Sequence, residues 1–314
     1  MNYIIVPVRN NLYLTRKAVK TFREQDIGDV RIIIIDNASS DGTAQWLSTQ
    51  KDILQVRYDP PKSVAESWNI GLDWVFGTRI GMGNADYALV VNNDVELRPD
   101  TYRWLVANGG GFVTAVGTND PEKVKPLGWD ALLPEPIAEV VASNPTYPTP
   151  DPNYNRPHPD FSCFLIRREV YEKVGMFDEN FKIAYCEDGD YDMRMWQSGI
   201  RAYCIDLPFL HHGAGTVKNG TLKEQRIIHA QAEKNREYFA KKHGVRMGSQ
   251  EYYEKLGKWG PESKEPVKQR TSEHLCHHHR AFLSKGCFTR EWCCICGGIP
   301  CPEPELDIVR QTPT

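Results

Sequence analysis

The chain has 314 residues, enough to bury a large core in one large domain or two small ones. Its formal net charge of −3 excludes a protein that binds nucleic acid through an overall basic surface. No stretch reaches the about 18 apolar residues that a membrane-spanning helix needs, and Pro7 ends the apolar run at the N-terminus. We therefore expect a cytoplasmic protein, either free or peripheral at a membrane.

Strands and helices are predicted to alternate along the first third of the chain. Runs of Ile, Val and Leu predict buried strands, and apolar residues spaced three or four apart predict helices. The strands are expected at 4–8, 31–35, 53–58, 88–91 and 112–116, and the helices at 12–22, 43–49, 64–76 and 100–106. This alternation favours an α/β fold with a parallel or mixed sheet flanked by helices.

A long segment rich in Pro, Asn and Asp, residues 117–159, interrupts this pattern, and such a loop inside a domain is usually functional or mobile. Order resumes with strands at 161–166 and 202–205 and with helices at 168–174 and 222–243. Between them, a further helix is expected to start near Glu187 and to stop at Gly199. The 222–243 helix is locally basic, which leaves a protein or a modified nucleic acid open as a binding partner.

Polar side chains follow the predicted strands where the strands end. Asp36 follows the run of isoleucines, and Asn92, Asn93 and Asp94 follow the strand at 88–91. Ligands of open α/β sheets bind at the carboxyl ends of the strands, and carboxylates and amides suit Mg²⁺ or Mn²⁺ on phosphates. An ordinary polar turn is the alternative for residues 92–94.

Two later clusters join these strand ends, the Glu187-Asp188 pair and His211-His212. In this order, the clusters resemble the inverting glycosyltransferases of family 2, among them rhamnosyl- and galactosyltransferases, which have the GT-A fold. The resemblance covers about residues 1–243. It is carried by Pro7-Val8-Arg9-Asn10, Asp36, Trp68-Asn69-Ile70-Gly71, Asn92-Asn93-Asp94, Glu187-Asp188 and His211.

The resemblance implies a role for each matched position. It implies a UDP- or dTDP-linked sugar donor, contacted by Pro7, Val8, Arg9, Asp36, Asn69, Asn92 and Asn93. Asp94 and His211 are expected to hold Mn²⁺ or Mg²⁺, and Asp188 to act as the catalytic base. We place Glu187 and Trp196 on the acceptor side, although a helix tryptophan is more often a packing residue. The acceptor is expected to be a glycan, a lipid-linked glycan or another compound with a hydroxyl group.

These residue types suit the chemistry of sugar transfer. The departing nucleotide diphosphate builds up negative charge, which a divalent cation neutralises as a Lewis acid. The acceptor hydroxyl needs a base as it attacks, and a single displacement inverts the anomeric carbon. Asp188 also fits a simple helix cap, which is compatible with catalysis. Adjacent histidines diverge, so we assign the metal to His211 and not to His212.

One departure from the family pattern leaves an alternative open. Asn92 stands where the family's Asp-x-Asp motif has its first acid. A degenerate domain that binds a nucleotide-sugar or a glycan without turnover is therefore the second hypothesis. A nucleotidyltransferase is the third, and the chain lacks the Gly-rich, Lys-ended loop near the N-terminus that it would need.

The predicted domain boundaries follow from the resemblance. A GT-A domain is expected at 1–245, with a nucleotide-sugar half at about 1–116 and an acceptor half at about 160–245. Residues 246–314 form an accessory segment whose end holds many soft ligands. These are Cys276, Cys287, Cys293, Cys294, Cys296, Cys301 and His277, His278, His279. A structural Zn²⁺ site is one interpretation of these ligands, although their spacing matches no standard arrangement of Cys-x₂-Cys pairs, and incidental thiols are the other. Cys163, Cys186 and Cys204 are expected to be reduced and buried.

Overall fold

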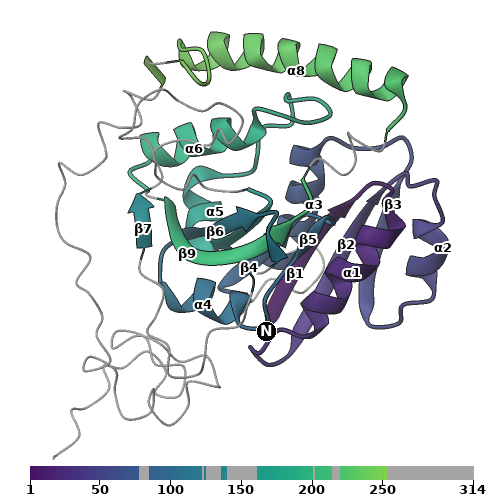
Figure 1. Ribbon diagram of the computed structural model, residues 1–314. Coiled ribbons are helices and arrows are strands. Elements are labelled where there is room, and N and C mark those ends of the chain that lie inside the picture. Colours follow the sequence, from purple (N-terminus) through teal and green to yellow (C-terminus); the bar gives the residue numbers. More distant parts are fainter. Residues whose placement is uncertain are drawn as a thin grey trace, which may run out of the picture.

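The computed structural model describes residues 1–77, 85–121, 124, 136–139, 161–200, 202–213, 220–249 and 251–252. Within these residues one nine-stranded sheet organises the chain (Figure 1). Its strands are β1 Asn2–Val8, β2 Val30–Asn37, β3 Ile53–Tyr58, β4 Tyr87–Val91, β5 Val95–Glu96, β6 Phe112–Thr118, β7 Pro136–Glu139, β8 Cys163–Arg167 and β9 Ala202–His211. The order is β3-β2-β1-β4-β8-β6-β9-β5, and β7 pairs with β9.

The sheet is mixed, as predicted. Strands β1 to β4 are joined by parallel pairings, whereas β8 runs antiparallel between β4 and β6. Strand β9 is parallel to β6 and antiparallel to β5 and β7. The carboxyl ends of β1, β2, β3 and β4 therefore meet at one edge of the sheet.

Helices cover both faces of this sheet (Figure 1). They are α1 Leu12–Arg23, α2 Thr43–Ser48, α3 Val64–Phe76, α4 Thr101–Ala107, α5 Arg168–Val174, α6 Glu187–Gln197 and α8 Leu222–His243. Helices α3 and α8 each begin with a capping box, formed by Ser63 with Glu66 and by Thr221 with Glu224. Such boxes satisfy the exposed N–H groups of a first helical turn, so the sequence itself fixes where these helices start.

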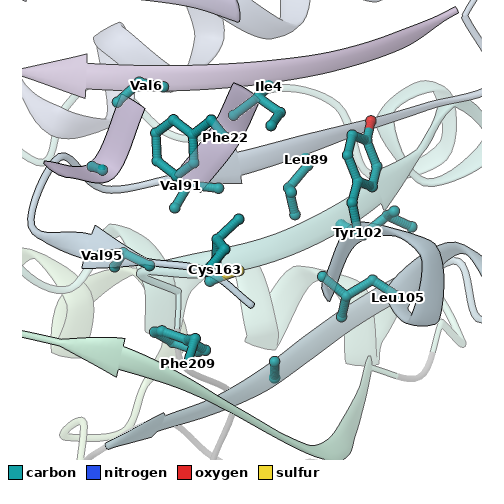
Figure 2. Close-up of a cluster of buried hydrophobic side chains, with 14 of the residues drawn as sticks. Ile4, Val6, Phe22, Leu89, Val91, Val95, Tyr102, Leu105, Cys163 and Phe209 are labelled. Carbon is teal, nitrogen blue, oxygen red and sulfur yellow. The ribbon is translucent and has the colours of Figure 1, made fainter. Parts of the chain in front are cut away.

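Successive strand residues supply two separate cores, because side chains of a strand alternate between faces. Ile4, Val6, Leu89 and Val91 pack with α1 and α4 on one face, where Figure 2 shows them with Phe22 and Tyr102. Tyr3, Ile5, Ile33 and Ile35 pack on the opposite face against the apolar side of α3. The four isoleucines of β2 are buried on both faces, as expected for a central parallel strand.

A third, smaller core joins α6 to α8. It consists of Phe181, Cys186, Met193, Phe239, Val245 and Tyr252. Tyr252 is fully buried there, so the folded body continues past the predicted boundary at residue 245. The rest of the accessory segment lies outside the described residues, and so does the predicted zinc site in the tail.

Several elements differ from the sequence prediction. Strand β9 continues to His211 instead of stopping at Ile205, and the short strand β5 was not predicted. Strand β7 lies within the segment that we expected to be a loop. Cys163, Cys186 and Cys204 are free and buried, as expected. None of the described helices combines the length and apolar composition that a bilayer span requires.

Candidate active site

Asp94 and His211 come together because β5 pairs with the end of β9. After β4, the N–H of Asn92 donates to the carbonyl of Ser162 at 2.8 Å, which turns the chain into β5. The antiparallel β5–β9 pairing sets Val95 opposite His211. As a result, Nε2 of His211 lies 3.5 Å from Oδ1 of Asp94. On its other side, Nδ1 of His211 lies 3.3 Å from the hydroxyl of Ser162.

His212 has a different partner from His211. Its Nε2 lies 2.7 Å from Oε1 of Glu96, which also accepts a hydrogen bond from Nζ of Lys17 at 2.8 Å. Burial favours a raised pKa for Glu96, but the hydrogen bonds from Lys17 and His212 outweigh it and lower the pKa. Neighbouring side chains of a strand point to opposite faces, so only one of the two histidines faces Asp94.

The Asp94–His211 pair fits a divalent cation. A carboxylate oxygen and an imidazole nitrogen bond such ions at about 2.0–2.2 Å, so one ion reaches both atoms across the 3.5 Å gap. Among the described residues, no group of three or more His, Cys, Asp or Glu side chains is placed to hold a metal. The remaining coordination positions would therefore fall to water or to oxygens of a ligand, as is usual for Mg²⁺.

Asp36 lies at the end of β2, in register with Val8 of β1. Its Oδ1 accepts from the N–H of Ser39 at 3.0 Å, and the hydroxyl of Ser39 accepts from the N–H of Asn10 at 2.8 Å. The carbonyl of Asn10 in turn accepts from Nδ2 of Asn93 at 3.1 Å. This path of contacts links Asp36 to the residue preceding Asp94, so both acids lie at the same edge of the sheet.

Arg57 of β3 joins Asp36, and sequence analysis missed it. Its Nη1 donates to Oδ2 of Asp36 at 2.5 Å and to the carbonyl of Ser39 at 3.0 Å. The side chain of Asp36 is 3% exposed, whereas that of Arg57 is 41% exposed. Within the described part of the chain, Nε and Nη2 of Arg57 have no hydrogen-bond partner, so these donors face outward. The β2–β3 register that pairs the two residues is invisible in the sequence.

Buried acids surround Asp188 at the start of α6. Burial, reinforced by the charge of Asp188, raises the pKa of Glu187 to about 8, which keeps this acid protonated at neutral pH. The same two causes raise the pKa of Asp192 well above its usual range. Asp192 is four residues, about one helical turn, from Asp188 and therefore lies on the same face of α6. Neither Oε2 of Glu187 nor Oδ2 of Asp192 has a hydrogen-bond partner among the described residues.

The start of α6 lies at the same sheet edge as Asp36. The carbonyl of Ile183 accepts from the N–H of Val64 at 2.9 Å, at the beginning of α3. Ser67 in the first turn of α3 accepts from Nδ2 of Asn37, the last residue of β2, at 2.7 Å. Asp188 follows Ile183 by five residues, and its place in a shared site with Asp36 and Asp94 stays a prediction. Its Oδ1 accepts from the N–H of Gly189 at 2.7 Å.

The Trp68–Gly71 element has a structural role in α3, and the predicted contact of Asn69 with the sugar donor stays a prediction. The amide nitrogen of Asn69 donates to the carbonyl of Phe177 and to Oε1 of Glu179, both at 2.9 Å. A Cβ at Gly71 would lie 2.2 Å from Cγ2 of Ile5, so glycine is needed for α3 to approach β1. These residues hold α3 on the sheet.

Three other predicted contact residues have partners within the chain, and their predicted roles stay predictions. Asn93 is buried and donates its amide hydrogens to the carbonyl of Asn10 and the hydroxyl of Thr15, next to Asp94. The side chain of Val8 packs in the core beneath α1. Trp196 packs against the α6–α8 cluster, about 12 Å along the helix from Asp188 at 1.5 Å per residue. Pro7, Arg9 and Asn92 are half-buried at the sheet edge and keep their predicted roles as predictions.

Known structures provide distant similarities. S. aureus TarS 1–349 in complex with UDP is 13% identical, covers 67% of this chain and gives a TM-score of 0.46. The mannosyltransferase PcManGT from Pyrobaculum calidifontis, in complex with GDP-Man and Mn²⁺, is 16% identical, covers 69% and gives 0.46. The match spans 60% of the first of these chains and 58% of the second. GalNAc-T7 with UDP, GalNAc and Mn²⁺ is 12% identical over 67% of this chain and 43% of its own, with a TM-score of 0.47.

Sequence comparison identifies the family. No curated protein matches the sequence. The family profile described as Glycosyl transferase family 2 matches residues 3–175, which is more than half of the chain. That range contains β1 to β4, β6 and β8, with Asp36 and Asp94 at their strand ends, and the mixed sheet is that of the GT-A fold. The chain therefore belongs to glycosyl transferase family 2.

Proposed function

We propose that this protein transfers a sugar from a nucleotide-sugar to an acceptor hydroxyl in one displacement, with inversion, assisted by Mn²⁺ or Mg²⁺. The family membership supports transfer from a nucleotide-sugar. The observation that carries the rest of the proposal is the approach of Asp94 Oδ1 to His211 Nε2 at 3.5 Å. These two atoms belong to ligand types that a divalent cation prefers, and they lie at a ligand-binding edge of the sheet.

The nucleobase is proposed to bind at Asp36 and Arg57. Uracil and thymine present a ring N–H beside carbonyl oxygens, so a carboxylate and a guanidinium side by side match both groups. Asp36 and Arg57 form such a pair, held by the Nη1–Oδ2 hydrogen bond. This arrangement supports a UDP- or dTDP-linked sugar donor, with Pro7, Arg9 and Asn92 flanking the base and the diphosphate.

The leaving group is proposed to depart beside Asp94 and His211. A bound divalent cation neutralises the charge that develops on the diphosphate. Asp94 supplies a carboxylate oxygen, and His211 supplies Nε2. Ser162 contacts Nδ1 of His211 and so fixes the orientation of the imidazole ring. Metal-binding histidines commonly have such a partner on the ring nitrogen that does not bind the metal.

The acceptor hydroxyl is proposed to lose its proton to Asp188 as it attacks the anomeric carbon. Glu187 is buried beside it, and its raised pKa of about 8 keeps it a neutral hydrogen-bond donor at pH 7. A neutral neighbour leaves the negative charge of the pair on Asp188, which suits a base. The acceptor is a glycan, a lipid-linked glycan or another hydroxyl compound. The proposed location is the cytoplasm, free or peripheral at a membrane, which cell fractionation tests.

A panel of nucleotide-sugars tests this function. Purified protein is incubated with Mn²⁺ and UDP-, dTDP- and GDP-linked sugars, and the released nucleotide is measured with and without acceptor. We expect slow hydrolysis of one donor, which chelation and Asp94→Asn both abolish. Proton NMR of the first-formed product then shows whether the anomeric configuration is inverted, and a retained configuration contradicts the proposed single displacement.

A degenerate binding domain is the second candidate, and Asn92 favours it. Asn92 replaces the first acid of the family motif, which leaves Asp94 as the carboxylate ligand on that turn. A protein of this kind binds one nucleotide-sugar in a titration but releases no nucleotide with any acceptor. If the same panel gives that result, the binding-domain hypothesis holds and the enzyme hypothesis is wrong.

A further inference from the structure

The segment leading into α6 has an unusual backbone. Ile183, Tyr185 and Cys186 have φ values of 62°, 79° and 75°, all in the left-handed region. Side chains other than Gly and Asn rarely adopt this conformation, and a β-branched isoleucine there is an outlier. Strained backbone persists only where its surroundings enforce it, and it clusters at functional sites. Glu187 and Asp188 follow directly.

Asn235 of α8 enforces this conformation. Its side chain is buried, and Nδ2 donates to the carbonyls of Lys182 at 2.9 Å, Ala184 at 2.9 Å and Tyr185 at 3.0 Å. An amide nitrogen carries two hydrogens, so one of them is shared between two carbonyls. Oδ1 of Asn235 accepts from the N–H of Lys182 at 3.3 Å. One side chain therefore binds both ends of the strained segment.

The opposite side of the segment is also held. The carbonyl of Ile183, which Asn235 does not reach, accepts from the N–H of Val64 in α3. Buried backbone groups need partners, and here four successive carbonyls are satisfied by a helix on each side. The segment 182–185 thus packs between α3 and α8, and each of its four carbonyls accepts a hydrogen bond from one of these helices.

Helix α8 is anchored to α6 at its C-terminal end. Its first turn is closed by the capping box of Thr221 with Glu224. At its last turn, Nζ of Lys242 lies 2.6 Å and Nε2 of His243 lies 2.8 Å from Oδ1 of Asp190 in α6. Figure 1 shows α8 lying across the outside of α6. Asn235 therefore has a fixed position relative to the helix that carries Asp188.

We propose that Asn235 is a positioning residue, which sets the place of Asp188 by holding the three carbonyls of the strained segment. This inference rests on the proposed function of Asp188 as the base. A base displaced by about 1 Å loses most of its effect, and such misplacement can lower turnover about 100-fold. Asp36 and Asp94, where the nucleotide-sugar is proposed to bind, lie in β2 and in the turn after β4, outside this segment.

Asn235→Asp tests the proposal, because it keeps the size of the side chain and removes its donor hydrogens. We expect kcat for transfer to fall about 10- to 100-fold, while KM for the nucleotide-sugar stays within about twofold. The matched control is Gln231→Ala. Gln231 donates to Oδ1 of Asn235 at 2.9 Å and, among the described residues, forms no hydrogen bond with the segment, so kcat is expected to stay near wild type. Unchanged turnover in Asn235→Asp overturns the proposal, as does an equal loss in both variants.

Amide hydrogen exchange separates this proposal from the proposed function. In Asn235→Asp we expect faster exchange at residues 182–190 than in wild type or Gln231→Ala, whether or not the protein turns over any sugar. A wild type without turnover refutes the proposed function and leaves the exchange result to decide whether Asn235 holds the segment. Exchange rates equal to wild type in Asn235→Asp overturn the inference.

Discussion

The two halves of the candidate site are built in different ways. In the half formed by β1 to β4, Asp36 lies at the end of β2 and Asp94 lies in the turn after β4, and the parallel pairing of both strands with β1 brings those strand ends together. In the half formed by α6 and α8, Asp188 follows a strained segment that contacts distant in sequence hold in place. The first half is thus fixed by the sheet, whereas the second depends on single side chains. We therefore expect variants in the first half to affect binding of the metal or the nucleotide, and variants in the second half to affect turnover.

The largest effect is expected at Asp94. Asp94→Asn removes the carboxylate of the proposed cation site, and we expect turnover to fall about 1,000-fold or more, together with binding of Mn²⁺. The matched control is Glu96→Gln, two residues further on, which pairs with His212 and Lys17 instead. Calorimetric titration with Mn²⁺ and a kinetic assay check both. Undiminished Mn²⁺ affinity in Asp94→Asn would contradict the assignment.

Asp188→Asn should separate turnover from binding. Loss of a general base costs about 100- to 10,000-fold in kcat, whereas the affinity for the nucleotide-sugar should not change. Titration of the variant with the nucleotide diphosphate measures that affinity. Should Asp188→Asn weaken nucleotide binding as much as it lowers turnover, the two halves would not be independent, and the comparison would fail.

Arg57→Ala should weaken nucleotide binding and leave turnover nearly unchanged, the opposite of what we expect for Asp188→Asn. A hydrogen bond to a charged group is worth about 1.5–3 kcal/mol, so we expect nucleotide affinity to fall about 10- to 100-fold. The turnover of saturated enzyme should change little. Arg31→Ala, near the other end of β2, provides the control because Arg31 is exposed and far from that strand end. Equal affinities in the two variants would remove Arg57 from the proposed base site.

The smallest effect concerns stability at Glu187. Its pKa is raised from 4.5 in the unfolded chain to about 8 in the folded protein, so the folded state binds more protons between these pH values. The free energy of unfolding therefore falls as pH rises through this window. Glu187→Gln removes the titration, and we expect about 1–3 kcal/mol of added stability at pH 8 but little change at pH 4. Denaturant unfolding at both pH values measures this, and equal effects at the two pH values would contradict the raised pKa.

The features of the fold that could be predicted depend on residues that are close together in the sequence. The starts of α3 and α8 follow from Ser63 with Glu66 and Thr221 with Glu224, three residues apart in each case. The run of isoleucines in β2 predicted a buried parallel strand. The polar residues that follow β4 identified Asp94 as a candidate ligand. The partners of Asn69, Asn93 and Trp196 within the chain could not be predicted, because they lie far away in the sequence.

Local physics, then, determined where strands and helices form and which acids follow them, because periodicity and capping act over a few residues. Tertiary structure decided which of those acids meet. The β5–β9 pairing brought His211 to Asp94, the β2–β3 register brought Arg57 to Asp36, and α8 brought Asn235 to the segment before Asp188. Each of these contacts joins residues whose separation depends on the packing of whole elements, and no nearby pattern in the chain encodes it.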